Sequence, residues 1–160
     1  MLKTSAKAWE KAADIELRER FGLTGAKWKI ITVLSIKEGI TQKHIADMLF
    51  VEAPTLVSVI DKMEKDGYVK RESDSNDRRN NLIFMTKKSK DIVDPIIESI
   101  LEIRNMGLNK ISKKDMEAAK KVLAQIITNT EKFISQKGEK TDPDLWTEPQ
   151  NKSQKTLVKL

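Results

Sequence analysis

Apolar residues recur every three or four positions along most of this 160-residue chain, a spacing that predicts amphipathic helices. The first helix is predicted to start at an N-cap on Thr4 or Ser5 and to stop at Gly22. Its apolar stripe, which we expect to face a partner, consists of Ala8, Trp9, Ala12 and Ile15. A second helix is predicted to start at Thr24 and to end near Gly39. Its apolar face consists of Trp28, Ile31 and Leu34 or Ser35.

The middle of the chain predicts a short helix followed by a longer one. The short helix covers 41–50 and is capped by Thr41, whose side chain can accept a hydrogen bond from a free backbone amide. The longer helix covers 53–66, has Pro54 in its first turn and ends at Gly67. The residues of these helices that we expect to be buried are Ile45, Met48, Leu49, Leu56, Val59, Ile60 and Met63.

Two short stretches after these helices, "YVKRE" (68–72) and "NLIFMT" (81–86), predict strands joined by a polar loop. The order is therefore helix, short helix, connector, helix and β-hairpin. This order is typical of a winged helix-turn-helix, in which the second helix of the pair enters the major groove of DNA. The predicted fold class is mainly α with a small β-hairpin wing (α+β).

The C-terminal half predicts two long amphipathic helices, over 89–107 and 112–134, the second with Ser112 as N-cap. The second helix has an apolar stripe consisting of Met116, Ala119, Val122, Leu123, Ile126, Ile127, Phe133 and Ile134. A small winged helix cannot cover so much apolar surface, so we expect a homodimer around a two-fold axis. Packing within a monomeric bundle is the alternative.

Pro95 conflicts with a regular helix over 89–107, because a proline inside a helix costs about 3 kcal/mol and forces a kink. Alternatively, Asp94 caps a fresh helix that has Pro95 in its first turn. Both alternatives predict a bend at this point.

Exposed polar residues of the helix pair are candidates for contact with DNA. With its apolar stripe buried, the helix over 53–66 leaves outside Thr55, Val57, Ser58, Asp61 and Lys62. The hydroxyls of Thr55 and Ser58 can exchange hydrogen bonds with base edges or phosphates, and Val57 can pack on a thymine methyl group. The short helix starts with Thr41, Gln42 and Lys43, where backbone amides favour a phosphate. An ordinary solvated helix surface is the alternative.

The polar loop "RESDSNDRRNN" (71–81) helps to decide between a surface that contacts DNA and an ordinary solvated helix surface. Between residues 68 and 90 there are seven basic and three acidic residues, and Arg78 and Arg79 lie at the tip of the loop. An arginine at such a tip can reach the minor groove, where the potential of DNA is most negative. Asp77 can orient such an arginine through a charge-assisted hydrogen bond.

Composition narrows the range of functions. The net charge of +6 and a pI of about 9.4 favour an acidic partner such as nucleic acid. The chain has no cysteine, which excludes disulfides, thiolate metal sites and cysteine nucleophiles. We expect no catalytic residue, cofactor or metal, because His44 is the only histidine and lacks a ligand cluster. Charges at the N-terminus and the absence of a long apolar run predict a cytoplasmic protein without membrane contact.

Residues 41–86 resemble the DNA-binding core of the multiple antibiotic resistance regulator (MarR) family. The similarity consists of "TQKHIA" at the short helix, "PTLVSVID" at the longer helix, "GYVKR" at the first strand and "DRR" in the wing. It extends more loosely from about Leu23 to Ile134. The resemblance implies a homodimeric transcription regulator, usually a repressor released by a small molecule, that binds a pseudo-palindromic double-stranded operator.

The resemblance also implies roles for single residues. Arg79 matches the wing-tip arginine that enters the minor groove, and Asp77 matches the acid that orients it. The reading face of the recognition helix is matched by Pro54, Thr55, Val57 and Ser58. Members of the family often have Thr-Arg in place of Val57-Ser58, so a common contact with guanine is missing here.

Effectors of the family are often aromatic or anionic small molecules that bind where the dimerisation helices meet the DNA-binding winged helix. The residues that we expect to contribute to such a pocket are Trp9, Arg18, Phe21, Lys27 and Trp28. Tryptophans on helical stripes are more often core residues, which is the alternative.

Three parts are therefore predicted: a helical dimerisation region (1–22 and 90–136), a DNA-binding region (23–89) and a polar tail (137–160). The recognition helix (about 53–66) is assigned to the major groove and the wing (74–81) to the minor groove. A protein–protein assembly module and a non-specific DNA-coating protein are the alternatives.

Overall fold

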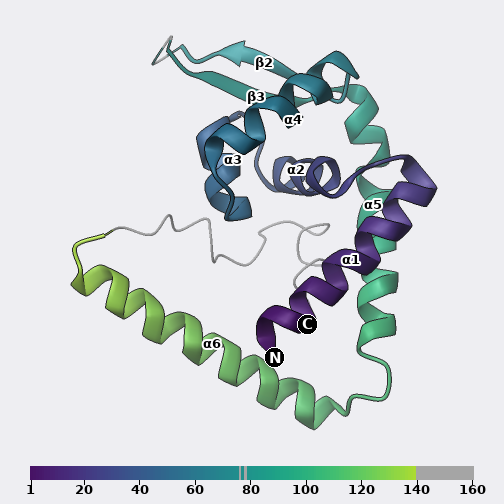
Figure 1. Ribbon diagram of the computed structural model, residues 1–160, viewed down its shortest axis with the longest axis vertical. Coiled ribbons are helices and arrows are strands. Elements are labelled where there is room, and N and C mark those ends of the chain that lie inside the picture. Colours follow the sequence, from purple (N-terminus) through teal and green to yellow (C-terminus); the bar gives the residue numbers. More distant parts are fainter. Residues whose placement is uncertain (76, 78, 140–160) are drawn as a thin grey trace.

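The computed structural model describes residues 1–75, 77 and 79–139, and its elements follow the predicted order (Figure 1). The helices and strands are α1 (Leu2–Phe21), α2 (Gly25–Ile36), β1 (Ile40–Thr41), α3 (Gln42–Leu49), α4 (Ala53–Lys65), β2 (Val69–Ser73), β3 (Asn81–Met85), α5 (Lys87–Gly107) and α6 (Lys113–Gln136). The predicted winged helix-turn-helix, mainly α with a small β-hairpin, is confirmed.

A three-stranded antiparallel sheet in the order β1-β3-β2 closes one side of the head, the name used here for residues 23–89. Ile83 on the central strand is the register partner of both Ile40 and Arg71. The sequence analysis missed β1, because a strand of two residues shows no alternation of apolar and polar positions.

The core of the head is made by the inner faces of α2, α3 and α4 together with the sheet. Its fully buried side chains are Leu23, Ile30, Ile31, Leu34, Ile45, Ile60, Met63, Val69 and Ile83. The predicted inner faces of these helices are confirmed, with Met48, Leu49 and Val59 partly buried against this core.

The start of α1 differs from the prediction. The helix begins at Leu2, and Ser5 lies inside it, where its hydroxyl donates to the carbonyl oxygen of Leu2 at 3.0 Å. A serine that bonds back to the preceding turn is compatible with a helix interior, so the predicted N-cap on Thr4 or Ser5 is wrong. The residues of α1 that reach the core are Ala13 and Leu17, whereas the side chains of the predicted stripe are partly or largely exposed.

Two of the predicted N-caps are confirmed by side-chain hydrogen bonds. Thr41 Oγ1 accepts from the backbone N–H of His44 at 3.2 Å, and Ser112 Oγ accepts from that of Asp115 at 3.1 Å. Each bond satisfies one amide that the first turn of a helix leaves without an intrahelical partner. Thr24 also occupies the N-cap of α2, but without a side-chain bond.

Pro95 lies in the interior of α5, so the alternative in which Asp94 caps a fresh helix is wrong. The carbonyl oxygen of Pro95 accepts a hydrogen bond from Ser99 Oγ at 2.9 Å. Ile96, Ile97 and other apolar residues of α5 are buried, and their packing offsets the cost of about 3 kcal/mol for a proline in a helix. The expected bend stays a prediction.

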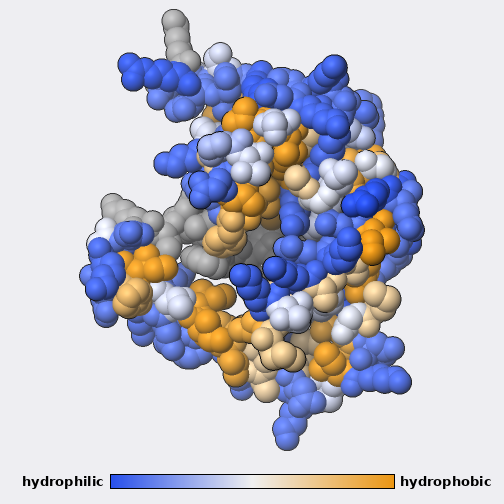
Figure 2. Space-filling view, viewed as in Figure 1, coloured by the Kyte–Doolittle hydropathy of each residue, from blue (hydrophilic) through white to orange (hydrophobic). Residues whose placement is uncertain are grey.

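The apolar stripe of α6 has no cover among the described residues. The helix extends away from the head (Figure 1), and none of its residues is buried. Figure 2 shows hydrophobic side chains gathered along α6. Val122, Leu123, Ile126 and Phe133 of this helix are each more than 40% exposed. Within the described part of the chain, α6 is therefore not packed into a bundle with the other helices, and the choice between dimer and monomer stays a prediction.

Candidate nucleic-acid interface

α4 presents one continuous face to solvent. Pro54, Val57, Ser58 and Asp61 recur at the spacing of a single helical face, and all four are exposed. We call these four residues the reading stripe. The opposite face is buried in the core of the head, which fixes the rotation of α4 about its axis. Thr55 and Lys62, also predicted to contact DNA, are exposed beside the stripe.

Asp77 organises the backbone of the wing loop. Its carboxylate accepts hydrogen bonds from the backbone N–H of Arg79 at 3.0 Å and from Asn80 Nδ2 at 3.1 Å. The backbone N–H of Asn80 donates to the carbonyl oxygen of Asp77 at 2.9 Å. Asp77 thus fixes the peptide that carries Arg79, which is exposed. Arg78, also predicted to contact DNA, lies outside the described residues.

A cleft of about 210 Å³ joins the wing to the N-terminus of α3. The pairing of β1 with β3 produces it, because Thr41 is the register partner of Leu82 and α3 therefore begins beside the wing. The residues that line the cleft are Thr41, Gln42, Lys43, Arg79, Asn80 and Asn81. Two cationic side chains and a helix N-terminus at one cleft favour an anion such as a phosphate group.

Arg71 connects the wing to both helices of the pair, a role that the sequence analysis did not assign to it. Its guanidinium donates to Gln42 Oε1 at 2.9 and 3.0 Å, to Asp61 Oδ1 at 2.5 Å and to Glu64. Burial lowers the pKa of Arg71, but the hydrogen bonds to Asp61 and Glu64 outweigh it, so the net shift is upward. The side chain is 18% exposed and positively charged, and it compensates the charge of Asp61 on the reading stripe.

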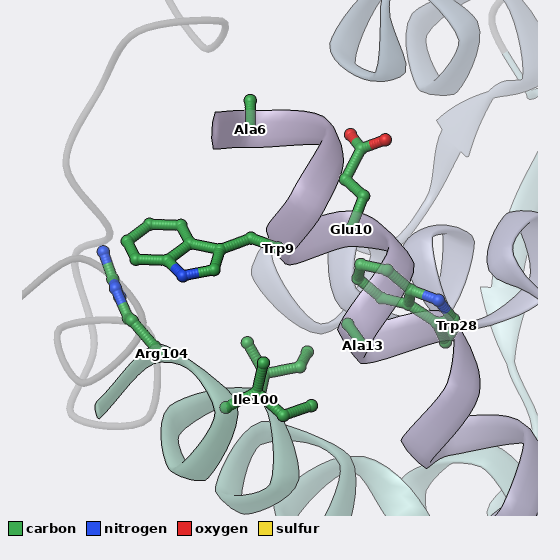
Figure 3. Close-up of a pocket in the computed structure, with 8 residues that line it drawn as sticks. Ala6, Trp9, Glu10, Ala13, Trp28, Ile100 and Arg104 are labelled. Carbon is green, nitrogen blue, oxygen red and sulfur yellow. The ribbon is translucent and has the colours of Figure 1, made fainter. Parts of the chain in front are cut away.

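A second candidate site is an apolar cavity of about 320 Å³ between α1 and α5. Trp9 projects from α1 across its opening, and Trp28 closes another side (Figure 3). The indole N–H of Trp28 donates to Asp14 Oδ1 at 2.7 Å, which fixes its ring. Arg104 also lines the cavity, and burial lowers the pKa of its guanidinium.

Two of the five predicted pocket residues, Trp9 and Trp28, come together at this cavity, and three lie elsewhere. Lys27 pairs with Asp66 at 2.6 Å. Phe21 packs against the core, and Arg18 is exposed on α1. The cation at the cavity is thus Arg104, which the sequence analysis missed because α5 brings it there from far along the chain.

His44, the only histidine in the sequence, is half-buried on α3. Among the residues that the structure describes, no cluster of three or more potential metal ligands occurs. None of the helices in that same part of the chain has both the length and the apolar composition to cross a membrane.

An exposed helix face beside a basic β-hairpin defines the class of winged-helix DNA-binding proteins. A sequence profile of the MarR family matches residues 21–80. An uncharacterized HTH-type transcriptional regulator of Bacillus subtilis (strain 168), YwoH, is 32% identical over 117 residues, which cover 73% of this chain and 84% of that protein. The chain belongs to the MarR family and is a transcriptional regulator, not an enzyme.

Solved structures agree with this assignment. The transcriptional regulator PA3341 matches with a TM-score of 0.72 and 30% identity over 82% of this chain and 96% of that one. A MarR family regulator from Listeria monocytogenes, in complex with a 26mer DNA, matches with a TM-score of 0.69 and 21% identity. That match covers 88% of this chain and 95% of the Listeria chain, and at this identity it shows the fold alone.

Proposed function

We propose that the protein is a dimeric, sequence-specific repressor that places α4 in the major groove and the wing (74–81) in the minor groove. The observation that carries this proposal is the cleft between α3 and the wing, because it joins Lys43 and Arg79 beside a helix N-terminus. A phosphate in this cleft would fix the head on the DNA backbone, with the reading stripe toward the bases. A transcription regulator must reach chromosomal DNA, which supports a cytoplasmic location.

Fluorescence anisotropy on the DNA upstream of the gene tests this proposal. We expect a preference of at least a hundredfold over a scrambled duplex at near-physiological salt, and a loss of about tenfold or more in Arg79→Ala. Lys3→Ala, which removes one positive charge from α1, is the matched control and should bind as the native protein does. An unchanged affinity in Arg79→Ala would contradict the role of the wing and favour an assembly module. Equal binding to both duplexes would favour non-specific coating.

The exposed apolar stripe of α6 supports the dimer. Two copies of α6, together with α1 and the C-terminal part of α5, would cover one another around a two-fold axis. The two heads would then lie about one turn of DNA apart, about 34 Å, on a pseudo-palindromic operator. This scheme uses the predicted division into a dimerisation region (1–22 and 90–136) and a DNA-binding region (23–89).

Sedimentation equilibrium measures the oligomeric state directly. Ile126→Glu places a charge on the stripe of α6, and we expect it to convert a dimer into a monomer. Thr128→Glu, two residues away and off the stripe, is the matched control that should remain dimeric. A native protein that sediments as a monomer at micromolar concentration would contradict the proposal.

The cavity between α1 and α5 supports regulation by a small aromatic or anionic effector. Its walls are mainly apolar, and Arg104 supplies a positive charge beside the indole of Trp9 (Figure 3). We expect benzoate and its larger aromatic analogues to change the fluorescence of Trp9 and to weaken DNA binding. Arg104→Gln should reduce the affinity for these carboxylates more than for neutral aromatic compounds. Equal losses for both would contradict the charge-based part of the proposal.

A further inference from the structure

The reading stripe of α4 has an unusual chemistry for a surface that reads base pairs. Its N-terminal part consists of Pro54 and Val57, which carry only apolar side-chain atoms, and Val57 is 41% exposed. Ser58 adds one hydroxyl group. Asp61 adds a carboxylate whose charge is compensated by Arg71. The part of a recognition helix that reaches the base edges is its N-terminal part, so these residues decide what is read.

Guanine offers two acceptors, N7 and O6, in the major groove, and a strong contact with it needs a bidentate donor such as arginine or lysine. No such donor lies on the reading stripe, all four residues of which are described. The cations of α4 are Lys62 and Lys65, both in its last turn. Glu52, the exposed N-cap residue, carries only acceptor oxygens when ionised and cannot donate to guanine either.

Adenine is normally read by asparagine or glutamine through its N6 and N7 atoms, which requires a free amide oxygen. The nearest glutamine, Gln42, uses its Oε1 atom to accept two hydrogen bonds from Arg71. It is therefore held as part of the network around Arg71 and cannot offer the bidentate contact. Ser58 contributes a single hydroxyl, which can bond to any base pair and so selects little. The selective contact that remains for the stripe is with the one apolar feature of the major groove, the C5-methyl group of thymine.

We infer that the protein selects its operator through thymine methyl groups, contacted by Val57 and Pro54, and that its half-sites are rich in A·T pairs. This inference rests on the DNA-binding function proposed above and adds the chemistry of the sequence that is read. Arg79 supports it independently, because A·T tracts have the narrow minor groove that attracts an inserted arginine.

The experiment starts with selection of duplexes from a random library by the full-length native protein. Each thymine of the selected half-site is then replaced by deoxyuridine, which removes the methyl group and leaves all hydrogen-bonding atoms in place. We expect about a fourfold loss of affinity at one or two positions per half-site, the value for burial of one methyl group. In Val57→Ala, the loss at one of these positions should disappear, whereas the losses at all other positions should remain.

Val51→Ala is the matched control, because Val51 is 42% exposed and lies on the connector before α4. It should retain the full set of deoxyuridine effects, which separates a lost methyl contact from a general effect of truncating a surface valine. Circular dichroism of each variant checks that the fold is kept.

Three results would overturn the inference. The first is a selected half-site with an invariant G·C pair at the position that Val57→Ala affects. The second is uniform tolerance of deoxyuridine. The third is an undiminished deoxyuridine effect in Val57→Ala. In these cases specific binding persists, so the proposed function stands while the methyl readout fails. A library that yields no preferred sequence would overturn both.

Discussion

Replacement of Arg71 by methionine tests whether one side chain holds the wing, α3 and α4 together. Methionine keeps the apolar stem and the approximate volume, and it removes the guanidinium that Gln42, Asp61 and Glu64 share. The bond to Glu64, whose side chain is 39% exposed, is expected to contribute the most. With the contact to the 60% exposed Asp61 discounted for solvent, the expected loss is about 3 kcal/mol.

Urea denaturation followed by circular dichroism measures this loss. For a slope of about 2 kcal/mol per molar urea, the midpoint should fall by about 1.5 M with the slope unchanged. All proteins are compared at one concentration, because a dimer gains stability by mass action. Arg71→Lys should lose about half as much, since lysine keeps the charge but not the planar fork.

The neighbouring Lys70 provides the matched control. Its side chain is 56% exposed and pairs with Glu72 on the solvent side of β2, so Lys70→Met should change the free energy of unfolding by less than about 0.5 kcal/mol. If Arg71→Met shifts the midpoint no further than Lys70→Met, the network around Arg71 does not stabilise the fold and the reasoning is refuted.

The same variant separates stability from DNA binding. Without Arg71, the carboxylate of Asp61 stands uncompensated on the reading stripe and repels the phosphate backbone. Under conditions where Arg71→Met is folded, its DNA affinity should therefore be lower than that of the native protein. Adding Asp61→Asn should restore much of the affinity while leaving the stability low. If the double variant regained neither DNA affinity nor stability, or regained both, the two effects of Arg71 could not be separated in this way.

Three further predictions follow from single contacts. Phe50 has a φ of 53° and is 66% exposed, so Phe50→Asn should raise the free energy of unfolding by about 0.5–1 kcal/mol in urea titrations, because asparagine tolerates this backbone conformation. Asp66 has a pKa below its usual 3.8, chiefly through the hydrogen bond from Lys27, so the stability it contributes is present above that pH and is lost as the pH falls through the lower, folded value. The difference in thermal stability between the native protein and Asp66→Asn should accordingly shrink in acid, and an unchanged difference would refute the assignment. In Gly107→Ala, the new Cβ would lie 2.0 Å from Trp9 Nε1, so the indole N–H resonance of Trp9 should shift in NMR spectra while that of Trp28 stays.

Local features of the fold were predictable from the sequence because each depends on residues close together in the chain. The caps at Thr41 and Ser112 and the inner face of α4 follow from side chains within one or two helical turns. The first turn of α1 was misplaced for a related reason, since Ser5 can bond either as a cap or back to its own helix, and sequence alone does not separate the two.

Features of the candidate site that join distant segments were not predictable. Arg71 meets Gln42 across 29 positions of sequence, and Arg104 lines the cavity beside Trp9, which lies 95 positions earlier in the sequence. Such contacts depend on the register of β1 against β3 and on the packing of α5 along α1. In the case of β1, the strand was too short to leave a pattern. Lys27 was expected at the pocket as a counter-charge, but successive side chains of a helix point about 100° apart, and Lys27 pairs with Asp66 on a different side from Trp28.

The uninterrupted course of α5 has a mechanical consequence. The helix starts directly after β3, where Ser89 donates to the carbonyl oxygen of Tyr68, and it ends beside the cavity at Gly107. Its 21 residues span about 30 Å, so a tilt of about 5° around its middle displaces each end by about 1.3 Å in opposite directions. A change in packing at the cavity that tilted α5 would therefore also displace the end of the helix that follows β3.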